Sequence, residues 1–269
     1  MIKKCSFSIY FEQPFFIPER NSQKNMENDI RKEIFLKLIH TPRATFSDLW
    51  NQKVESNLFA YHLRKLEEEG LIEKFEDGYG LTAEGRKASA FIEGATGGKA
   101  ELPTPTVIIL AREDGKILCQ ERLKEPFYGY WGFPSGKINF GWNPEECAIR
   151  DFEEETGLTA GKAELKVAAF VKTYEEGKIL HHHLMFTVEV SDIKGTLKEQ
   201  THKAKHEWLT IEEYKSKKRF PDTTPFEKTI EPNKFHIYEV ERFMNKGIFT
   251  SANITSEKEF STHSNDIPK

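Results

Sequence analysis

The stretch from Asn143 to Gly157 constrains the fold of this chain more than any other, because it carries both a helix start and a helix stop. Asn143 is a good N-cap residue, Pro144 suits the first helical position, and Glu146 completes a capping box. Gly157 supplies the glycine that commonly ends a helix. The sequence therefore predicts a helix over about 144–156. Its apolar side is formed by Ala148, Ile149 and Phe152.

Three carboxylates lie on one sector of this predicted helix. At about 100° per residue, Asp151, Glu154 and Glu155 share roughly 100° of the helix surface. Carboxylates this close repel one another, and a divalent cation would relieve the repulsion. Oxygen-rich sites of this kind suit Mg²⁺ or Mn²⁺, with substrate phosphates completing the coordination shell. The alternative is a solvated acidic face, in which Arg150 and Glu154 belong to an ordinary surface ladder of charges.

The segment before the helix favours a functional site over a solvated face. Gly136 follows a strand-like run, Tyr130–Pro134, and a glycine there lets its carbonyl approach the helix closely. A strand, a glycine loop and an acidic helix in this order predict a site at their junction.

On these residues the segment Trp131–Leu158 resembles the Nudix box, G-x5-E-x7-R-E-U-x-E-E-x-G-U, in which U is aliphatic. The lead-in Trp131–Lys137 and the later Glu207-Trp208-Leu209 also resemble that family, and the similarity covers about 125 residues. The matching box positions are Gly136, Arg150, Glu154, Glu155, Gly157 and Leu158.

The resemblance implies an α/β/α sandwich with a mixed sheet, and an enzyme that hydrolyses a nucleoside diphosphate linked to another moiety. It implies Mg²⁺ or Mn²⁺ as cofactor. The metal ligands carried over by position are the Gly136 carbonyl, Asp151, Glu154 and Glu155. Arg150 is carried over as the box arginine, and by this resemblance Arg150, Glu154 and Glu199 are the expected catalytic residues. Glu154, or a loop carboxylate such as Glu199, is the expected general base, since a metal-bound water needs only one proton acceptor.

Two box positions depart from the family pattern. The first glutamate, which in the family supports the arginine and the loop, is Trp142 here, and the glutamate after the arginine is Asp151. The shorter side chain sets its carboxylate back by roughly 1.5 Å. The sequence leaves open whether the site stays active, prefers Mn²⁺ or is inactive, because Mg²⁺ tolerates little geometric error.

Further candidates for substrate binding lie outside the box. Arginines at the ends of the first two predicted strands suit phosphate, and the alternative is that they only solvate strand ends. Aromatic residues before the box suit nucleobase stacking. Two histidines, His181 and His183, share one face of a predicted strand over 179–190, without an evident third metal ligand. The substrate-binding candidates are Arg112, Arg122, Tyr128 and Tyr174.

The chain divides into two domains in this interpretation. Its 269 residues suit about two domains, and the glycine-rich stretch over 94–102 is typical of a linker. The predicted organisation is an N-terminal extension (1–25), a helical domain (26–93), the linker (94–102), the Nudix domain (103–230), and a C-terminal helix with a disordered tail (231–269). The overall class is α+β.

The first domain reads as three helices, a hairpin around Asp77-Gly78 and a last helix. This order, with the stretches over 56–73 and 79–86, resembles winged helix-turn-helix domains. The resemblance implies a third helix that enters a major groove. Residues 26–95 hold 10 Lys/Arg and 13 Asp/Glu. Their net charge of about −3 does not provide the basic surface that is typical of a DNA-binding domain. The expected nucleic-acid contacts are Ser56, Asn57, Tyr61, Arg64 and Lys65.

Composition leaves a second class of function open. Three widely spaced cysteines make neither a disulfide framework nor a metal knuckle, so a reducing cytoplasm is the expected compartment. No apolar run is long enough for a bilayer, and no membrane partner is expected. The leading hypothesis is the pyrophosphohydrolase with a nucleotide-derivative substrate. The alternative is a transcription regulator whose Nudix domain senses a nucleotide. Whether the chain forms a homodimer stays open.

Overall fold

The structure is a computed structural model that describes residues 22–92, 100–221 and 233–261. The chain separates into two compact units, residues 1–101 and 102–269. Most of the predicted N-terminal extension and linker lies outside the described residues. Within those residues, no helix has the length and apolar character needed to cross a membrane.

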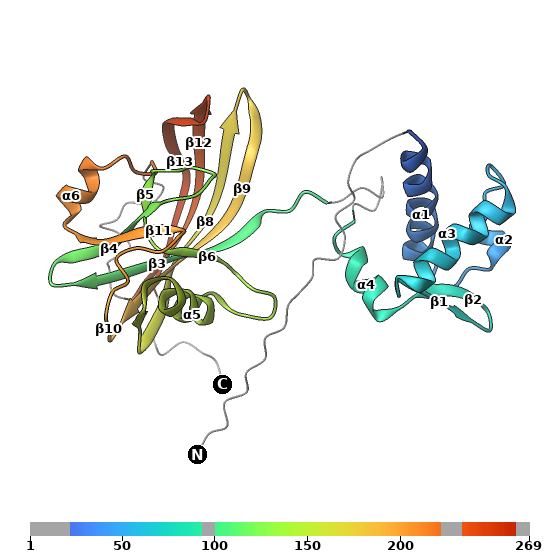
Figure 1. The fold of residues 1–269 in the computed structure, drawn as a ribbon, viewed down its shortest axis with the longest axis horizontal. Coiled ribbons are helices and arrows are strands. Elements are labelled where there is room, and N and C mark those ends of the chain that lie inside the picture. Colours follow the sequence, from blue (N-terminus) through green and yellow to red (C-terminus); the bar gives the residue numbers. More distant parts are fainter. Residues whose placement is uncertain (1–21, 93–99, 222–232, 262–269) are drawn as a thin grey trace, which may run out of the picture. The chain divides into compact units, whose positions relative to one another are not determined.

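The first unit has the predicted order of elements (Figure 1). The Thr45 side chain caps the second helix through a capping box with Asp48, and Thr82 caps the fourth. Ile34, Phe59 and Leu63 lie in a shared apolar core, whereas Leu58 is 38% exposed. The elements are α1 (Ser22–His40), α2 (Phe46–Leu49), α3 (Ser56–Glu68), β1 (Ile72–Phe75), β2 (Gly78–Leu81) and α4 (Ala83–Ser89).

The second unit is built on a mixed sheet of nine strands in the described residues, which confirms the predicted mixed sheet. The order is β11-β4-β3-β9-β8-β12-β13, with β5 on β4 and β6 on β3; β3–β9 and β8–β12 are parallel. The elements are β3 (Thr104–Glu113), β4 (Lys116–Arg122), β5 (Trp131–Gly132), β6 (Ser135–Lys137), α5 (Pro144–Thr156), β7 (Leu158–Thr159), β8 (Lys162–Glu175), β9 (Lys178–Ser191), β10 (Lys194–Gly195), β11 (Ala204–Leu209), α6 (Ile211–Ser216), β12 (Lys234–Asn245) and β13 (Ile248–Ser261).

Helix α5 covers one face of this sheet. Its Cys147, Ala148 and Phe152 are fully buried against Val107 and Ile109 of β3, in one apolar core. Among the described residues the opposite face has much less helical cover, because α6 has six residues and contacts β4 and β11. The face of β3 turned away from α5 is therefore available to line a cavity.

The prediction of a C-terminal helix and disordered tail is wrong for residues 234–261, which form the β12–β13 hairpin (Figure 1). His236, Tyr238 and Val240 are buried at every second position, as expected of a strand rather than a helix. The hairpin turns at Lys246 and Gly247, which both have positive φ. Residues 262–269 lie outside the described part of the chain.

Candidate functional site

Helix α5 starts and ends where its capping residues predict. The Asn143 side chain accepts a hydrogen bond from the Glu146 amide at 2.8 Å, and the Glu146 carboxylate accepts one from the Asn143 amide at 3.0 Å. Gly157 closes the helix at φ 75°. Ile149, expected on the apolar side, is 36% exposed. These capping contacts fix where α5 begins and ends, and therefore fix which of its acidic residues lie beside β6.

The Asp151 carboxylate lies against the backbone of Gly136 in β6. A Cβ atom added to Gly136 would stand 1.7 Å from Asp151 Oδ2, so only glycine leaves room for this approach. The other oxygen, Oδ1, accepts hydrogen bonds from Arg150 Nε at 3.1 Å and Nη2 at 2.5 Å. The two Asp151 oxygens therefore have separate neighbours, and Oδ2 faces the glycine loop.

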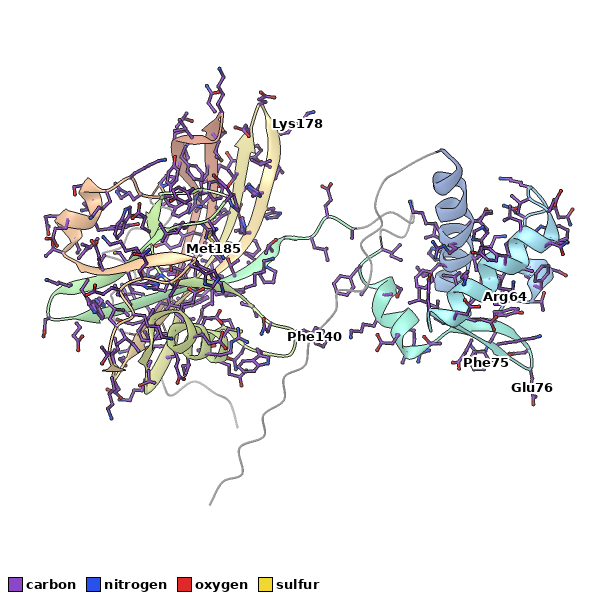
Figure 2. The ribbon with its side chains drawn as sticks, in the orientation of Figure 1. Arg64, Phe75, Glu76, Phe140, Lys178 and Met185 are labelled. Atoms are coloured by element: carbon purple, nitrogen blue, oxygen red, sulfur yellow. The ribbon has the colours of Figure 1, made fainter. Side chains whose placement is uncertain are left out.

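Trp142 supports the arginine in the place where the family has a glutamate. Its ring lies 4.9 Å from the Arg150 guanidinium carbon, a cation–π contact. Arg150 also approaches Glu154 at 3.9 Å. Burial alone would lower the pKa of Arg150, but the Asp151 hydrogen bonds raise it. Arg150 is thus held between an aromatic face and two carboxylates. Figure 2 shows Phe140 at the tip of the same loop between β6 and α5, and it is 88% exposed.

Glu155 faces a group of basic side chains. Burial raises the pKa of Glu155 and the Asp151 carboxylate adds to this effect, whereas Lys203, Lys124 and Arg122 act in the opposite direction. Burial in turn lowers the pKa of Arg122. Because Glu155 lies near one carboxylate and three cationic side chains, its carboxylate can bind a metal ion while the cations bind an anionic phosphate.

The three acidic residues of the predicted metal site do not all meet. In the part of the chain that the structure describes, no three His, Cys, Asp or Glu side chains converge to hold a metal ion. Glu154 is 67% exposed and lies on the Arg150 side of α5. The Gly136 backbone, Asp151 and Glu155 remain together, and this set of oxygens fits a hard divalent cation that takes further ligands from phosphate and water.

The loop that carries Glu199 is attached to the end of α5. The Lys198 amide donates to the Thr156 carbonyl at 2.7 Å, and the His206 amide donates to the Glu199 carbonyl at 2.7 Å. The Glu199 side chain is exposed. The structure thus brings Glu199 to the C-terminal end of the acidic helix, beside the box.

A cavity of about 240 Å³ lies over the sheet face opposite α5. Arg122 belongs to its lining, which links the cavity to the cations around Glu155. Figure 2 marks Met185, which lines the cavity from β9. The rest of its lining is Thr106, Ile108, Leu110, Gln120, Pro126, Phe127, Gly132, Phe133, Ser135, Ala169, Thr173, His183, Thr187, Tyr214, Phe220, Pro221 and Arg242.

The other three predicted substrate residues do not line this cavity. Arg112 forms an ion pair with Glu189 of the neighbouring strand β9. Tyr128 is 56% exposed. The Tyr174 hydroxyl donates to Glu241 at 3.2 Å, and the Tyr174 ring stacks on Phe243. The structure therefore brings only Arg122 of these four to the cavity and the box.

Several residues at this site were missed from the sequence. Lys203 lies near Glu155 and lowers the pKa of that residue. The Leu123 amide donates a hydrogen bond to the Lys203 carbonyl at 2.9 Å and so attaches the loop of Lys203 to the end of β4. Gln120 and Arg242 line the cavity from β4 and β12. The alternating pattern of 236–244 was a signal for β12, but no local pattern reveals that β12 pairs with β8.

In the first unit, the five predicted nucleic-acid residues lie on the outer side of α3. Ser56, Asn57, Tyr61 and Arg64 are exposed, and Lys65 is half-buried and pairs with Glu68 at 2.6 Å. The Lys65 ammonium also lies 5.8 Å from the Tyr61 ring centre.

Comparison with known families assigns both units. Residues 102–230 match the family described as NUDIX domain, so the predicted Nudix domain is confirmed. Residues 21–92 match a domain of unknown function, DUF7347, so the winged-helix interpretation stays a prediction.

The chain spans about a third to a half of the length of the curated relatives it matches. An ADP-ribose pyrophosphatase of Bacillus subtilis is 30% identical over 98 residues, which are 36% of this chain and 53% of that protein. An RNA pyrophosphohydrolase of Pseudomonas aeruginosa is 44% identical over 54 residues, or 20% and 32%.

Two solved structures are also similar. A MutT protein of Bacillus halodurans has a TM-score of 0.44 at 20% identity and covers 58% of this chain and 97% of its own. The NUDIX domain of Shewanella oneidensis NrtR, complexed with ADP ribose, has a TM-score of 0.38 at 17% identity, with 51% and 88% covered.

Proposed function

Because residues 102–230 are a NUDIX domain, we propose that this chain is a metal-dependent pyrophosphohydrolase that cleaves a nucleoside diphosphate linked to another moiety. One observation carries the proposal: the Asp151 carboxylate has one oxygen tied to Arg150 and the other against the Gly136 backbone. That arrangement supports a working box in spite of the change from glutamate to aspartate, because the shorter side chain still lies against the glycine loop. The sequences of the two relatives support the same reaction class.

The Gly136 carbonyl, Asp151 and Glu155 would hold Mg²⁺ or Mn²⁺. When bound, the cation supplies charge neutralisation on the diphosphate and a lowered pKa of its water. Glu154 has a different role in this proposal: its exposed carboxylate, which lies 3.9 Å from Arg150, would accept a proton from water. Glu199, on the loop attached to α5, is the second candidate for that proton.

Arg122, Lys124 and Lys203 are the residues proposed to bind the diphosphate oxygens. All three lower the pKa of Glu155, and Arg122 also lines the cavity. Their cationic groups would hold the substrate charge next to the acidic helix and orient the scissile bond. Arg150 does not contact the substrate in this proposal, since Asp151, Glu154 and Trp142 surround its guanidinium.

The test uses purified protein with ADP-ribose and a 5′-triphosphorylated RNA oligonucleotide, each with Mg²⁺ or Mn²⁺. Turnover should fall at least a hundredfold in Glu155→Gln. Glu153→Gln is the matched control, because Glu153 is exposed on the same helix and the charge change is identical. Comparing Glu154→Gln with Glu199→Gln then identifies the base. No release of nucleotide from any diphosphate substrate with either metal would refute the proposal.

A second candidate function is DNA binding by the first unit, with the Nudix domain sensing a nucleotide. The outward placement of Ser56, Asn57, Tyr61 and Arg64 on α3 favours it. Arg64→Ala should then weaken binding of the protein to its own upstream DNA, and the affinity should fall steeply with salt. Equal binding by the wild type and Arg64→Ala would remove this candidate.

A further inference from the structure

The cavity contains a buried amide oxygen that has no hydrogen-bond partner among the described residues. Gln120 of β4 is 5% exposed and lines the cavity, and its Oε1 accepts no hydrogen bond from the part of the chain that the structure describes. Leaving such an acceptor unsatisfied is unfavourable, so a group that supplies the missing donor belongs there.

Two further polar atoms of the cavity lining share this condition. Thr106 Oγ1 on β3 and His183 Nδ1 on β9 are buried and make no hydrogen bond within residues 22–92, 100–221 and 233–261. Burial lowers the pKa of His183 to about 4, and His181 and Arg242 act in the same direction, so its imidazole is neutral near pH 7. The cavity thus offers uncharged donors and acceptors along its polar side.

The walls of the cavity suit a flat group. Phe127 has φ 71° and stands among four rings, with its centre 5.1 Å from Phe249, 5.6 Å from Phe220, 5.7 Å from His181 and 6.3 Å from Tyr130. Phe127 and Phe220 line the cavity, and aromatic faces pack well on planar ligands. A planar ring with apolar faces and polar edges can stack on the aromatic walls and form hydrogen bonds with the polar atoms of the lining.

We propose that Gln120 selects the heterocycle of the substrate by accepting a hydrogen bond from a ring or exocyclic N–H group. The ligand class is a nucleoside whose base presents this donor, with its diphosphate directed past Arg122 toward Glu155. This inference rests on the proposed function for the diphosphate half. The selecting contact itself is independent of metal and of hydrolysis.

The test measures binding before turnover. Gln120→Met keeps the length of the side chain and removes both polar atoms. Calorimetric titration of AMP, GMP, CMP and UMP into the wild type without metal should show a preference of at least tenfold for one base. Gln120→Met should weaken that nucleotide about ten- to a hundredfold, as expected for a lost buried hydrogen bond. Ribose 5-phosphate, which has no base, should bind both proteins equally.

Two controls separate selection from a structural role. Gln200→Met, at an exposed position, should leave all affinities unchanged. The melting temperature of Gln120→Met should not fall below that of the wild type, because the variant removes an acceptor that makes no hydrogen bond to any described residue. Unchanged base preference in Gln120→Met, or a melting temperature that drops, would overturn the inference. Failure of the proposed function shows separately, as absent hydrolysis with intact nucleotide binding.

Discussion

Replacing Gly136 with alanine tests the contact on which the proposed metal site depends. The new Cβ would stand 1.7 Å from Asp151 Oδ2 and 2.7 Å from its Cγ, so the carboxylate must move. Gly136 has no positive φ, and the backbone itself therefore accepts an alanine. Moving Asp151 breaks its hydrogen bonds to Arg150, and a hydrogen bond to a charged group contributes roughly 1.5–3 kcal/mol. We expect Gly136→Ala to lower the free energy of unfolding by about this amount.

A double-mutant cycle isolates the cause. In Asp151→Ala the clashing atoms are absent, and the Gly136 Cβ would lie 3.5 Å from the remaining Cβ, an ordinary contact distance. Gly136→Ala should therefore cost little in the Asp151→Ala background, which makes the coupling nearly as large as the single-mutant effect. Urea denaturation of the four proteins measures it. Turnover of ADP-ribose should fall in every variant. An equal cost of Gly136→Ala in both backgrounds would refute the reasoning.

Three other predictions concern separate contacts. Trp142→Ala removes the ring beside Arg150, a contact of about 0.5–1 kcal/mol, and should slow hydrolysis about two- to fivefold. Trp142→Glu should restore the rate. Wild-type kinetics in Trp142→Ala would contradict this prediction. Gly85→Ala places a Cβ 1.9 Å from the Leu71 carbonyl oxygen and should lower the stability of the first unit by about 1–3 kcal/mol, measured by hydrogen exchange; unchanged protection would contradict it. Burial raises the pKa of the Cys119 thiol to about 12, so the native protein at pH 8 should resist thiol labelling at this residue until it unfolds, as peptide mass spectrometry can show. Rapid native labelling of Cys119 would be inconsistent with that burial.

The elements around the box were predictable because their signals are local. Asn143, Glu146 and Gly157 set the limits of α5 through contacts within a few residues. The Asp77-Gly78 turn predicted the β1–β2 hairpin in the same way. The C-terminal hairpin was not predicted, since its strand signal is an alternation whose meaning depends on which face is buried.

The predicted metal ligands show where local reasoning stops. The helical wheel placed Asp151, Glu154 and Glu155 on one sector, whereas in the structure Glu154 is 67% exposed and Asp151 is buried beside Gly136 and Arg150. Trp142 was expected only as a missing glutamate, and its ring instead stacks on that same arginine. Side-chain orientation on a helix depends on the neighbours that packing supplies, not on angular position alone.

The amino-acid order is enough to specify the capped acidic helix, the glycine loop before it and the Nudix resemblance of residues 103–230, because these depend on residues close together in the chain. Long-range packing specifies the rest. It brings Lys203 to Glu155, divides the two oxygens of Asp151 between Arg150 and Gly136, and gives Gln120 and Arg242, from strands far apart in sequence, a shared cavity. Contacts of this kind depend on strand order and on the burial of whole faces, which no local pattern encodes.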